Sequence, residues 1–379
     1  MNDGPGVVVR PVRARGELRA FIKFPFSLYR HDPNWVPPLL LDRLEFFDIR
    51  KNPFYLSADI ALFMAWRGTR PVGRIAACVN HDYNEFHNEK SGVFGFFECE
   101  HDREAAWVLF DTAAEWLKAR DQTSMFGPFN FSTNHEVGFL VDGFDSPPAV
   151  MMTYTRPYYT ELAEGWGMAK AKDLIAYRMD RSSPPAERIR KIADRVRTRN
   201  RVTIRSIDMD KFEQEIGSVR RIYNEAWSKN WGFVPLREEE FSHIAKDLRL
   251  IVSPELAFVA EADGRPVGFS LALPNVNEIQ VKIRNGRLFP TGFLRFWWEL
   301  KVRQSIRGIR IITMGVVHDY QKRGIESVFY VETFDRAVAM GYEWGEISWI
   351  LEDNDLMIRA AEALGSKRYK TYRIYGKQL

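Results

Sequence analysis

The chain has 379 residues, of which 45% are hydrophobic and 27% are charged, and its formal net charge is +4 at pH 7. This length predicts two domains with separate cores, and so small a net charge indicates no class of partner. No apolar run is long enough to span a bilayer and no signal peptide is apparent. The two cysteines, Cys78 and Cys99, lack metal-ligand spacing, so we expect a reduced, cytoplasmic protein without a metal site.

The first half of the chain predicts a hairpin followed by a strand, a helix and a strand. Ala61–Ala77 reads as two strands joined by a Gly-containing turn and the sequence Arg-Pro-Val-Gly. Gly92–Glu100 predicts the third strand, Arg103–Arg120 the helix and Met125–Thr133 the last strand.

The same order of elements returns in the second half, which indicates an internal repeat. Ala257–Ala272 is again a hairpin with Arg-Pro-Val-Gly, Ile311–Val317 is a strand, Ile325–Ala339 is a helix and Glu346–Leu351 is a strand. We therefore predict an α/β (α+β) fold with mixed sheets in two tandem domains, residues 1–180 and 205–379. The proline-marked, basic segment 181–204 predicts a linker helix between them.

The two strand-to-helix junctions differ in charge. In the first copy the junction carries Glu100, Asp102 and Glu104 and has no glycine, so it would repel a phosphate. In the second copy the polar turn His318–Gly324 precedes the helix. Gly324 lets the backbone approach a ligand closely, and the first N–H groups of a helix attract anions. This junction predicts a pyrophosphate cradle, with an ordinary surface turn as the alternative. The first copy reads as a degenerate copy, which we expect to shape the part of the site where a second substrate, the acceptor, binds.

Candidate catalytic and substrate-binding residues lie in loops near the ends of predicted strands and helices. His135 beside Glu136 suggests a base with an acidic partner, and Glu352 could accept a proton from an amine. The candidates for contact with substrate or donor are Asn230, Trp231, Tyr154 and Asn354. The structural alternatives are packing for the aromatic residues and helix capping by Asp353 or Asn354.

The segment 280–310 combines cations with aromatic residues. It holds eight Lys or Arg residues against one acid, Glu299, interleaved with Phe289, Phe293, Phe296, Trp297 and Trp298. Such a composition suits peripheral contact with an anionic membrane, here the inner membrane face, or room for a long acyl chain. The alternative is a helix whose aromatic stripe packs inward. We expect no nucleic-acid partner, because no RNA- or DNA-binding motif is present.

The junction of the second copy resembles motif A of the GNAT superfamily of acyl-CoA N-acyltransferases. The motif is met by Gln321, Lys322, Arg323, Gly324 and Ile325, whereas Glu326 stands where Gly or Ala is usual. The resemblance implies that these residues bind the pyrophosphate of acyl-CoA. It also implies that the preceding strand residues Met314, Gly315, Val316 and Val317 pair with the acyl-pantetheine arm. The family's tyrosine acid is missing, because Ala361 stands at its position.

Longer blocks resemble a group of bacterial tandem GNAT proteins that includes ceramide synthases. The blocks are FPF…DPNWVPP, GPFNFSTNHEVGFLVDGF, NWGF and RYKTYRIYGK. This resemblance implies an enzyme that transfers a long-chain acyl group from acyl-CoA to a sphingoid-type amine. An acetyl-CoA-dependent N-acetyltransferase of a small amine and a non-catalytic acyl-CoA-binding protein are the alternatives.

Overall fold

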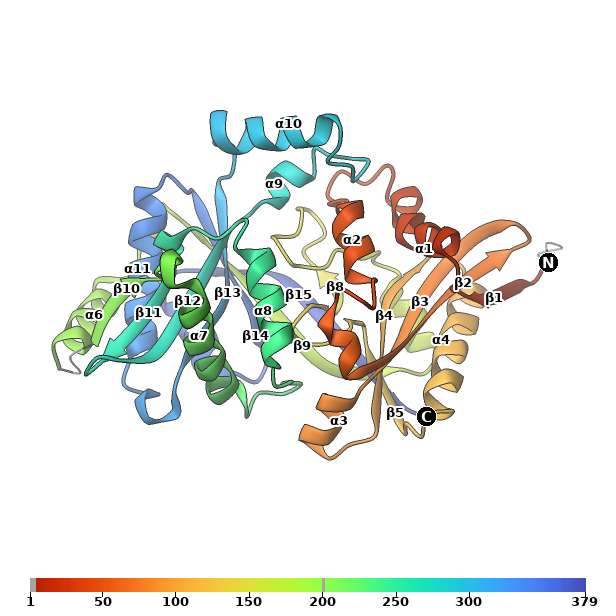
Figure 1. The fold of residues 1–379 in the computed structure, drawn as a ribbon, viewed down its shortest axis with the longest axis horizontal. Coiled ribbons are helices and arrows are strands. Elements are labelled where there is room, and N and C mark those ends of the chain that lie inside the picture. The colour runs from red at the N-terminus through yellow and green to blue at the C-terminus, as the bar shows by residue number, and fades with distance from the viewer. Residues whose placement is uncertain (1–4, 200–201) are drawn as a thin grey trace. The chain divides into compact units, whose positions relative to one another are not determined.

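The computed structural model describes residues 5–199 and 202–379, which form two compact units with mixed α/β structure (Figure 1). Unit 1 contains the described residues up to Leu174 together with Gln280–Phe296 and Lys370–Leu379. Unit 2 contains Ile175–Ile279 and Trp297–Tyr369. Strands β9 and β15 contribute residues to both units.

Unit 1 is built on a sheet in the order β1-β2-β3-β4-β5-β15, in which β4 and β5 are parallel and the other neighbouring strands are antiparallel. Its strands are β1 (Val7–Pro11), β2 (Ala58–Arg67), β3 (Arg70–Asn80), β4 (Ser91–Cys99), β5 (Ser124–Gly127), β6 (Phe129–Asn130), β7 (Glu136–Val137), β8 (Phe139–Asp142), and parts of β9 (Ala169–Asp180) and β15 (Lys367–Gln378). Its helices are α1 (Arg15–Leu28), α2 (Leu40–Phe46), η1 (Pro53–Leu56), α3 (His81–His87), α4 (Arg103–Lys118), α5 (Tyr159–Gly165) and the start of α10 (Thr291–Trp297).

The two faces of this sheet bury different helices because strand residues alternate between them. Ile75 and Ala77 of β3 pack with Leu109 of α4 in one cluster. Ala76 and Cys78 pack in the other, with side chains of α1 and the aromatic residues around it. Both cysteines are buried and unpaired, as expected of small core residues.

Unit 2 repeats the plan with the order β10-β11-β12-β13-β14-β9, in which β13 and β14 are parallel. Its strands are β10 (Val202–Ser206), β11 (Ala257–Ala262), β12 (Arg265–Pro274), β13 (Gly308–Val316), β14 (Trp344–Leu351), and parts of β9 and β15. Its helices are α6 (Glu187–Arg199), η2 (Met209–Lys211), α7 (Phe212–Trp227), α8 (Glu238–Leu248), η3 (Pro254–Leu256), α9 (Asn277–Gln280), η4 (Trp298–Val302), η5 (His318–Tyr320), α11 (Ile325–Ala339) and α12 (Asp355–Ala363).

Helices α7 and α11 cover opposite faces of strands β12 and β13. A side chain at Gly268 would meet Phe329 of α11, whereas one at Gly315 would meet Ala226 and Trp227 at the end of α7. The apolar residues of α11 sit at helical spacing, and Ile325, Val328 and Phe329 are fully buried. The start of α11 is therefore anchored in the core of unit 2.

The internal repeat extends to details of strand register. In the first hairpin the register shifts between Ala65 and Trp66, opposite Gly73 of the Arg-Pro-Val-Gly turn. In the second it shifts between Ala260 and Glu261, opposite Gly268 of the same turn sequence. Each copy then continues with an antiparallel strand, a helix and a parallel strand. The predicted order of elements is confirmed in both copies.

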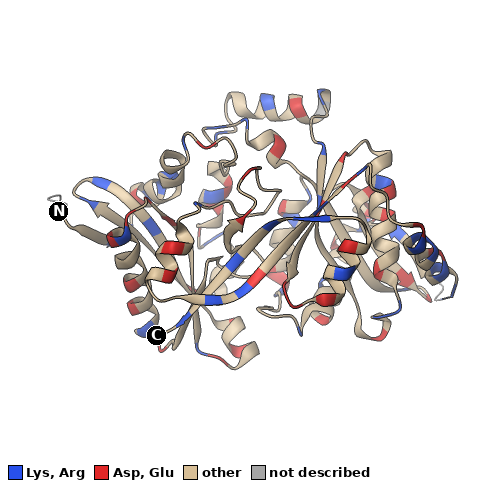
Figure 2. Cartoon of the chain, turned by 180° about the vertical axis from the view of Figure 1, so that it is seen from behind, with Lys and Arg blue, Asp and Glu red and all other residues tan. Residues whose placement is uncertain are grey.

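The basic segment between the copies forms α6, which packs on α11. Figure 2 shows Lys and Arg gathered along this helix. Two of its arginines pair with acidic residues of α11: Arg190 with Asp335 at 2.7 Å, and Arg197 with Glu332 at 2.6 Å. The predicted linker 181–204 also includes residues 200 and 201, which lie outside the described residues. Within the described ranges, none of the helices has both the length and the apolar character needed to cross a membrane.

Candidate active site

The parallel strands β13 and β14 of unit 2 pair only at their beginnings. Gly308–Ile311 lies beside Trp344–Ile347, after which each strand continues without the other. Ile312 forms a bulge, because Leu271 of β12 faces Thr313 and Ala272 faces Ile311. Beyond this point the two strand edges face a gap in the hydrogen-bond ladder, which we call the splay. Unpaired strand edges can hydrogen-bond an extended ligand.

The strand β13 leads from the splay into the predicted cradle. Val317 and η5 turn the chain, and Lys322 and Gly324 adopt left-handed φ angles of 60° and 84°. Gly324, the N-cap residue, has no side chain that could cap α11, and in the first turn the carboxyl group of Glu326 accepts its own backbone N–H. Lys322 and Arg323 are exposed beside it. This combination of a glycine turn, an uncapped helix start and two cations fits the diphosphate of a CoA ester.

Glu326, in the first turn of α11, is the one acidic residue at this helix start. Burial raises the pKa of its carboxyl group, although a hydrogen bond from its own backbone N–H opposes the shift. The neutral form is therefore favoured more than in an exposed glutamate, which reduces repulsion of a phosphate.

The matching junction of unit 1 is closed by its own side chains. The carboxylate of Asp102 accepts the N–H of Ala105 at 3.2 Å and caps α4, while Arg67 pairs with Asp102 and Glu104. The strand edge of β4 is also occupied, because Asn130 accepts the N–H of Phe96 at 2.7 Å. The first copy therefore lacks both the glycine turn of the predicted anion site and the unoccupied strand edge that the second copy has.

A buried polar network lies at the foot of the splay and was not among the sequence candidates. Arg310 and Glu346 are register partners on β13 and β14, are 3% and 0% exposed, and lie 3.4 Å apart (Nε to Oε1). The hydroxyl groups of Ser348 and Tyr369 both donate to the Glu346 carboxylate, and Arg310 Nε donates to Ser348 Oγ at 2.9 Å. Tyr369 is partly exposed. This network can carry a proton from the surface of the site to a buried carboxylate.

The signal for this network is present in the sequence. Arg310 and Glu346 interrupt otherwise apolar strands, and a buried charge requires a partner.

Three buried polar groups near the splay have no hydrogen-bond partner among the described residues: Ser270 Oγ, Thr313 Oγ1 and Trp349 Nε1. Thr313 and Trp349 belong to the separated parts of β13 and β14. Buried polar groups in native proteins are normally paired. Two orphaned side-chain groups on the separated parts of these strands therefore fit a site for a ligand with amide groups, such as the pantetheine arm.

The candidate residues that the sequence predicts in unit 2 follow either strand β14 or helix α7. Glu352 directly follows β14 and is half-buried, and Asn354 caps α12 by accepting the N–H of Met357 at 3.2 Å. The capping alternative is thus confirmed for Asn354, and its role in binding a ligand stays a prediction. Asn230 and Trp231 lie in the turn after α7, a helix whose Trp227 donates to Met314 O at 3.1 Å. Their roles stay predictions.

The candidates of unit 1 have firm structural partners. His135 Nδ1 lies 3.1 Å from Ser132 Oγ, and Glu136 pairs with Arg43 and accepts from Asn130. Burial raises the pKa of Glu136, but the charge and hydrogen bond of Arg43, the hydrogen bond from Asn130 and the nearby His135 together lower it by more, so the pKa of this carboxyl group is lowered. These contacts favour an ionised, structural Glu136, and the catalytic roles of His135 and Glu136 stay predictions.

Tyr154 of unit 1 donates to the Asp32 carboxylate at 3.1 Å. Burial and the charge of Asp32 raise the pKa of Tyr154 to about 12. Its hydroxyl group is therefore un-ionised at neutral pH, and its role in substrate binding stays a prediction.

Solved structures with the same arrangement are GNAT proteins. A tandem GNAT protein from the clavulanic acid biosynthesis pathway gives a TM-score of 0.57 at 12% identity, covering 98% of each chain. A GCN5-related N-acetyltransferase from Sphaerobacter thermophilus gives 0.54 at 12% identity, covering 98% of this chain and 95% of the other. The chain has the mixed α/β fold of the tandem GNAT proteins, and the predicted fold class is confirmed.

Two bacterial proteins are similar to this chain along nearly its whole length. It is 40% identical to the bacterial ceramide synthase of Caulobacter vibrioides, covering 98% of this chain and 97% of that protein. It is 37% identical to protein YghO of Escherichia coli, covering 98% of this chain and 95% of that protein. No protein-family model matches the sequence. The chain belongs to the family of these two bacterial proteins and has the tandem GNAT fold.

Proposed function

We propose that this protein transfers a long-chain acyl group from acyl-CoA to the amino group of a long-chain, sphingoid-type base. The observation that carries the donor is the uncapped, cationic start of α11, reached directly from the splayed strand β13. The acceptor class is drawn from the 40% identity to a bacterial ceramide synthase along nearly the whole chain.

Acyl-CoA supplies a thioester, and the protein has to hold it, stabilise the developing oxyanion and remove a proton from the amine. In our proposal the diphosphate binds the N–H groups at Gly324 with Lys322 and Arg323. The pantetheine arm then lies along Met314–Val317. This places the thioester near the splay, next to Ser348 and Tyr369.

Proton removal is assigned to the network at the foot of the splay. Tyr369 donates to Glu346, so this hydroxyl group can accept the amine proton as it passes its own to the carboxylate. Glu352, at the end of the same strand β14, is the second candidate base.

A membrane surface is the proposed source of the long-chain amine. The segment around α10 and η4 exposes large apolar side chains: Phe289, Phe293, Leu294, Trp297, Trp298 and Val302 are between 48% and 65% exposed. Arg287, Arg295, Arg303 and Arg307 are exposed among them. The aromatic stripe is thus not packed inward, and this mixture suits the interface of an anionic bilayer. We propose a peripheral position at the inner membrane face.

The decisive experiment is calorimetric titration with palmitoyl-CoA and with acetyl-CoA, followed by an assay with sphinganine and with a small amine as acceptors. Tight palmitoyl-CoA binding and an N-acyl sphinganine product, detected by mass spectrometry, are expected. Equal affinity for both donors with transfer to the small amine would replace the proposal by an N-acetyltransferase. Binding of palmitoyl-CoA without turnover on any amine would leave an acyl-CoA-binding protein.

A further inference from the structure

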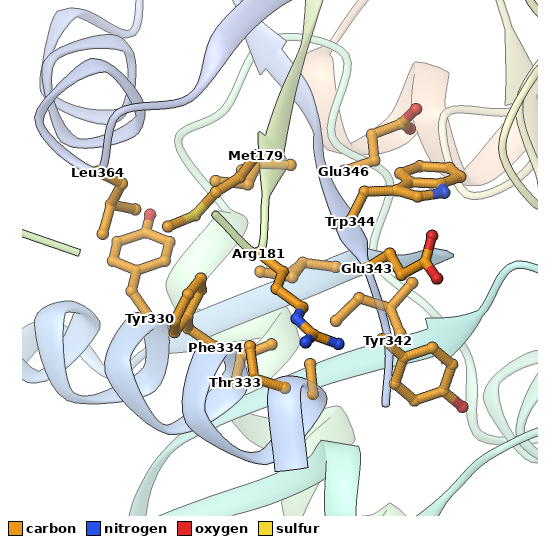
Figure 3. Close-up of a pocket in the computed structure, with 16 residues that line it drawn as sticks. Met179, Arg181, Tyr330, Thr333, Phe334, Tyr342, Glu343, Trp344, Glu346 and Leu364 are labelled. Carbon is orange, nitrogen blue, oxygen red and sulfur yellow. The ribbon is translucent and has the colours of Figure 1, made fainter. Parts of the chain in front are cut away.

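A largely apolar pocket that opens to solvent lies between α11 and the strands β9, β13 and β14 of unit 2 (Figure 3). We propose that it holds the hydrocarbon chain of the acyl donor and thereby sets the length of acyl group that the protein accepts. The inference rests on the proposed acyl-CoA donor and specifies where its chain is bound.

The cavity begins where the splay begins. Ile311 and Ile347 form the last register pair before β13 and β14 separate, and both line the cavity. A thioester held at the splay would therefore have its acyl carbons next to these two side chains. The carboxylate of Glu346 points away from α11 in Figure 3, so the charged network does not enter the apolar space.

From this point the cavity follows α11 away from the cradle. Tyr330, Phe334 and Ala337 recur on one face of the helix and line the cavity, while Thr333 and Val338 complete that wall. Tyr330 to Val338 spans about 12 Å at the rise of an α-helix. The phosphates would thus lie at the start of α11 and the pantetheine arm along β13. The thioester would lie at the splay and the acyl chain beside the second half of α11.

Two small residues on facing walls leave this space open. Ala337 of α11 is 7% exposed, and Gly345 of β14 would bring an added Cβ only within 3.5 Å of Ile309. A larger side chain at Ala337 would fill the groove without touching the cradle or the charged network. A straight aliphatic chain is the occupant that this shape favours, because the wall is mostly apolar, apart from the exposed side chains of Arg181 and Glu343, and is continuous with the proposed site of the thioester.

The test is the binding of palmitoyl-CoA and hexanoyl-CoA to Ala337→Phe, with Ala339→Phe as the matched control at an exposed position of the same helix. Ala337→Phe should weaken palmitoyl-CoA at least tenfold more than hexanoyl-CoA, whereas the control should leave the ratio of the two affinities unchanged. An unchanged ratio in a folded Ala337→Phe variant would overturn the inference. If neither donor binds the unaltered protein, the proposed function fails first.

If Ala337→Phe does not fold, a second variant and a labelling experiment test whether the cavity holds the acyl chain. Phe334→Ala enlarges the same wall and should shift the preference towards longer acyl chains. A palmitoyl-CoA with a diazirine at the end of its chain should label the peptide that contains Tyr330–Val338 in the unaltered protein. Labelling elsewhere, together with an unchanged preference in Phe334→Ala, would remove the cavity from the acyl site.

Discussion

At the scale of single residues, a comparison of two variants tests which residue takes the proton from the amine. Tyr369→Phe keeps the buried Arg310–Glu346 pair but removes the hydroxyl group that donates to Glu346. Because a positioned proton acceptor is worth about 10²- to 10⁴-fold, we expect turnover to fall by about a hundredfold with unchanged affinity for palmitoyl-CoA. Stopped-flow or steady-state rates with both substrates measure this.

Glu352→Gln is the parallel variant, because the end of β14 is the other candidate position for the base. A loss of turnover in Glu352→Gln with a normal rate in Tyr369→Phe would move the base to Glu352. Glu346→Gln is less suitable, since removing one partner of a buried ion pair costs about 3–5 kcal/mol of stability.

The unusual Glu326 makes a prediction about pH. Burial raises the pKa of this carboxyl group. The group is neutral below its pKa and negatively charged above it. Its repulsion of the donor phosphates should therefore be absent at low pH and grow as pH rises through its pKa. In Glu326→Gln this repulsion is gone at every pH. The ratio of palmitoyl-CoA affinities, variant over unaltered protein, should rise from about one at pH 4 to about three- to tenfold at pH 8. A ratio that stays flat across this range would mean that Glu326 does not face the phosphates.

At the scale of elements, we predict that α10 and η4 bind the surface of an anionic membrane. Trp297 and Trp298 are 48% and 53% exposed beside exposed arginines. Replacing both with Ala should reduce cosedimentation with vesicles of phosphatidylglycerol by about tenfold or more, since each aromatic side chain loses interfacial contact. The arginines should matter most at low salt.

Two controls distinguish a loss of membrane binding from a general loss of folded protein. Binding to purely zwitterionic vesicles should be weak for both proteins, and palmitoyl-CoA affinity should not change in the double variant. Equal cosedimentation of variant and unaltered protein would assign these tryptophans a different role.

The elements also show which parts of the protein the sequence could predict. The hairpins, α11 and the cradle come from residues close together in the chain, whose periodicity and turn chemistry are local. The Arg310–Glu346–Tyr369 network is not local, because it depends on the register between β13 and β14 and on where β15 begins. The closure of the first copy by Asn130 depends in the same way on a contact with Phe96, 34 residues away. Local motifs are enough to predict the proposed donor site, whereas the proposed acid–base groups follow only from the pairing of the strands.

At the scale of the whole molecule, the two copies predict one donor site per chain. In the first copy Asp102 caps α4 and Asn130 occupies the β4 edge, whereas the second copy leaves both positions open. Calorimetric titration should therefore give about one palmitoyl-CoA per chain, and that site should depend on Gly324.

Gly324→Asp and Gly324→Asn test this dependence as a pair. Both side chains tolerate a left-handed φ better than most residues, and both would place a Cβ 3.0 Å from Val196, so they share the same steric cost. They differ in charge, and a carboxylate at the cradle repels the diphosphate. We expect Gly324→Asp to abolish the binding heat while melting cooperatively, and Gly324→Asn to retain binding weakened by at most about tenfold. If Gly324→Asp still bound one palmitoyl-CoA with normal affinity, the donor site would lie outside the α11 cradle, and the asymmetry between the two copies would have no bearing on catalysis.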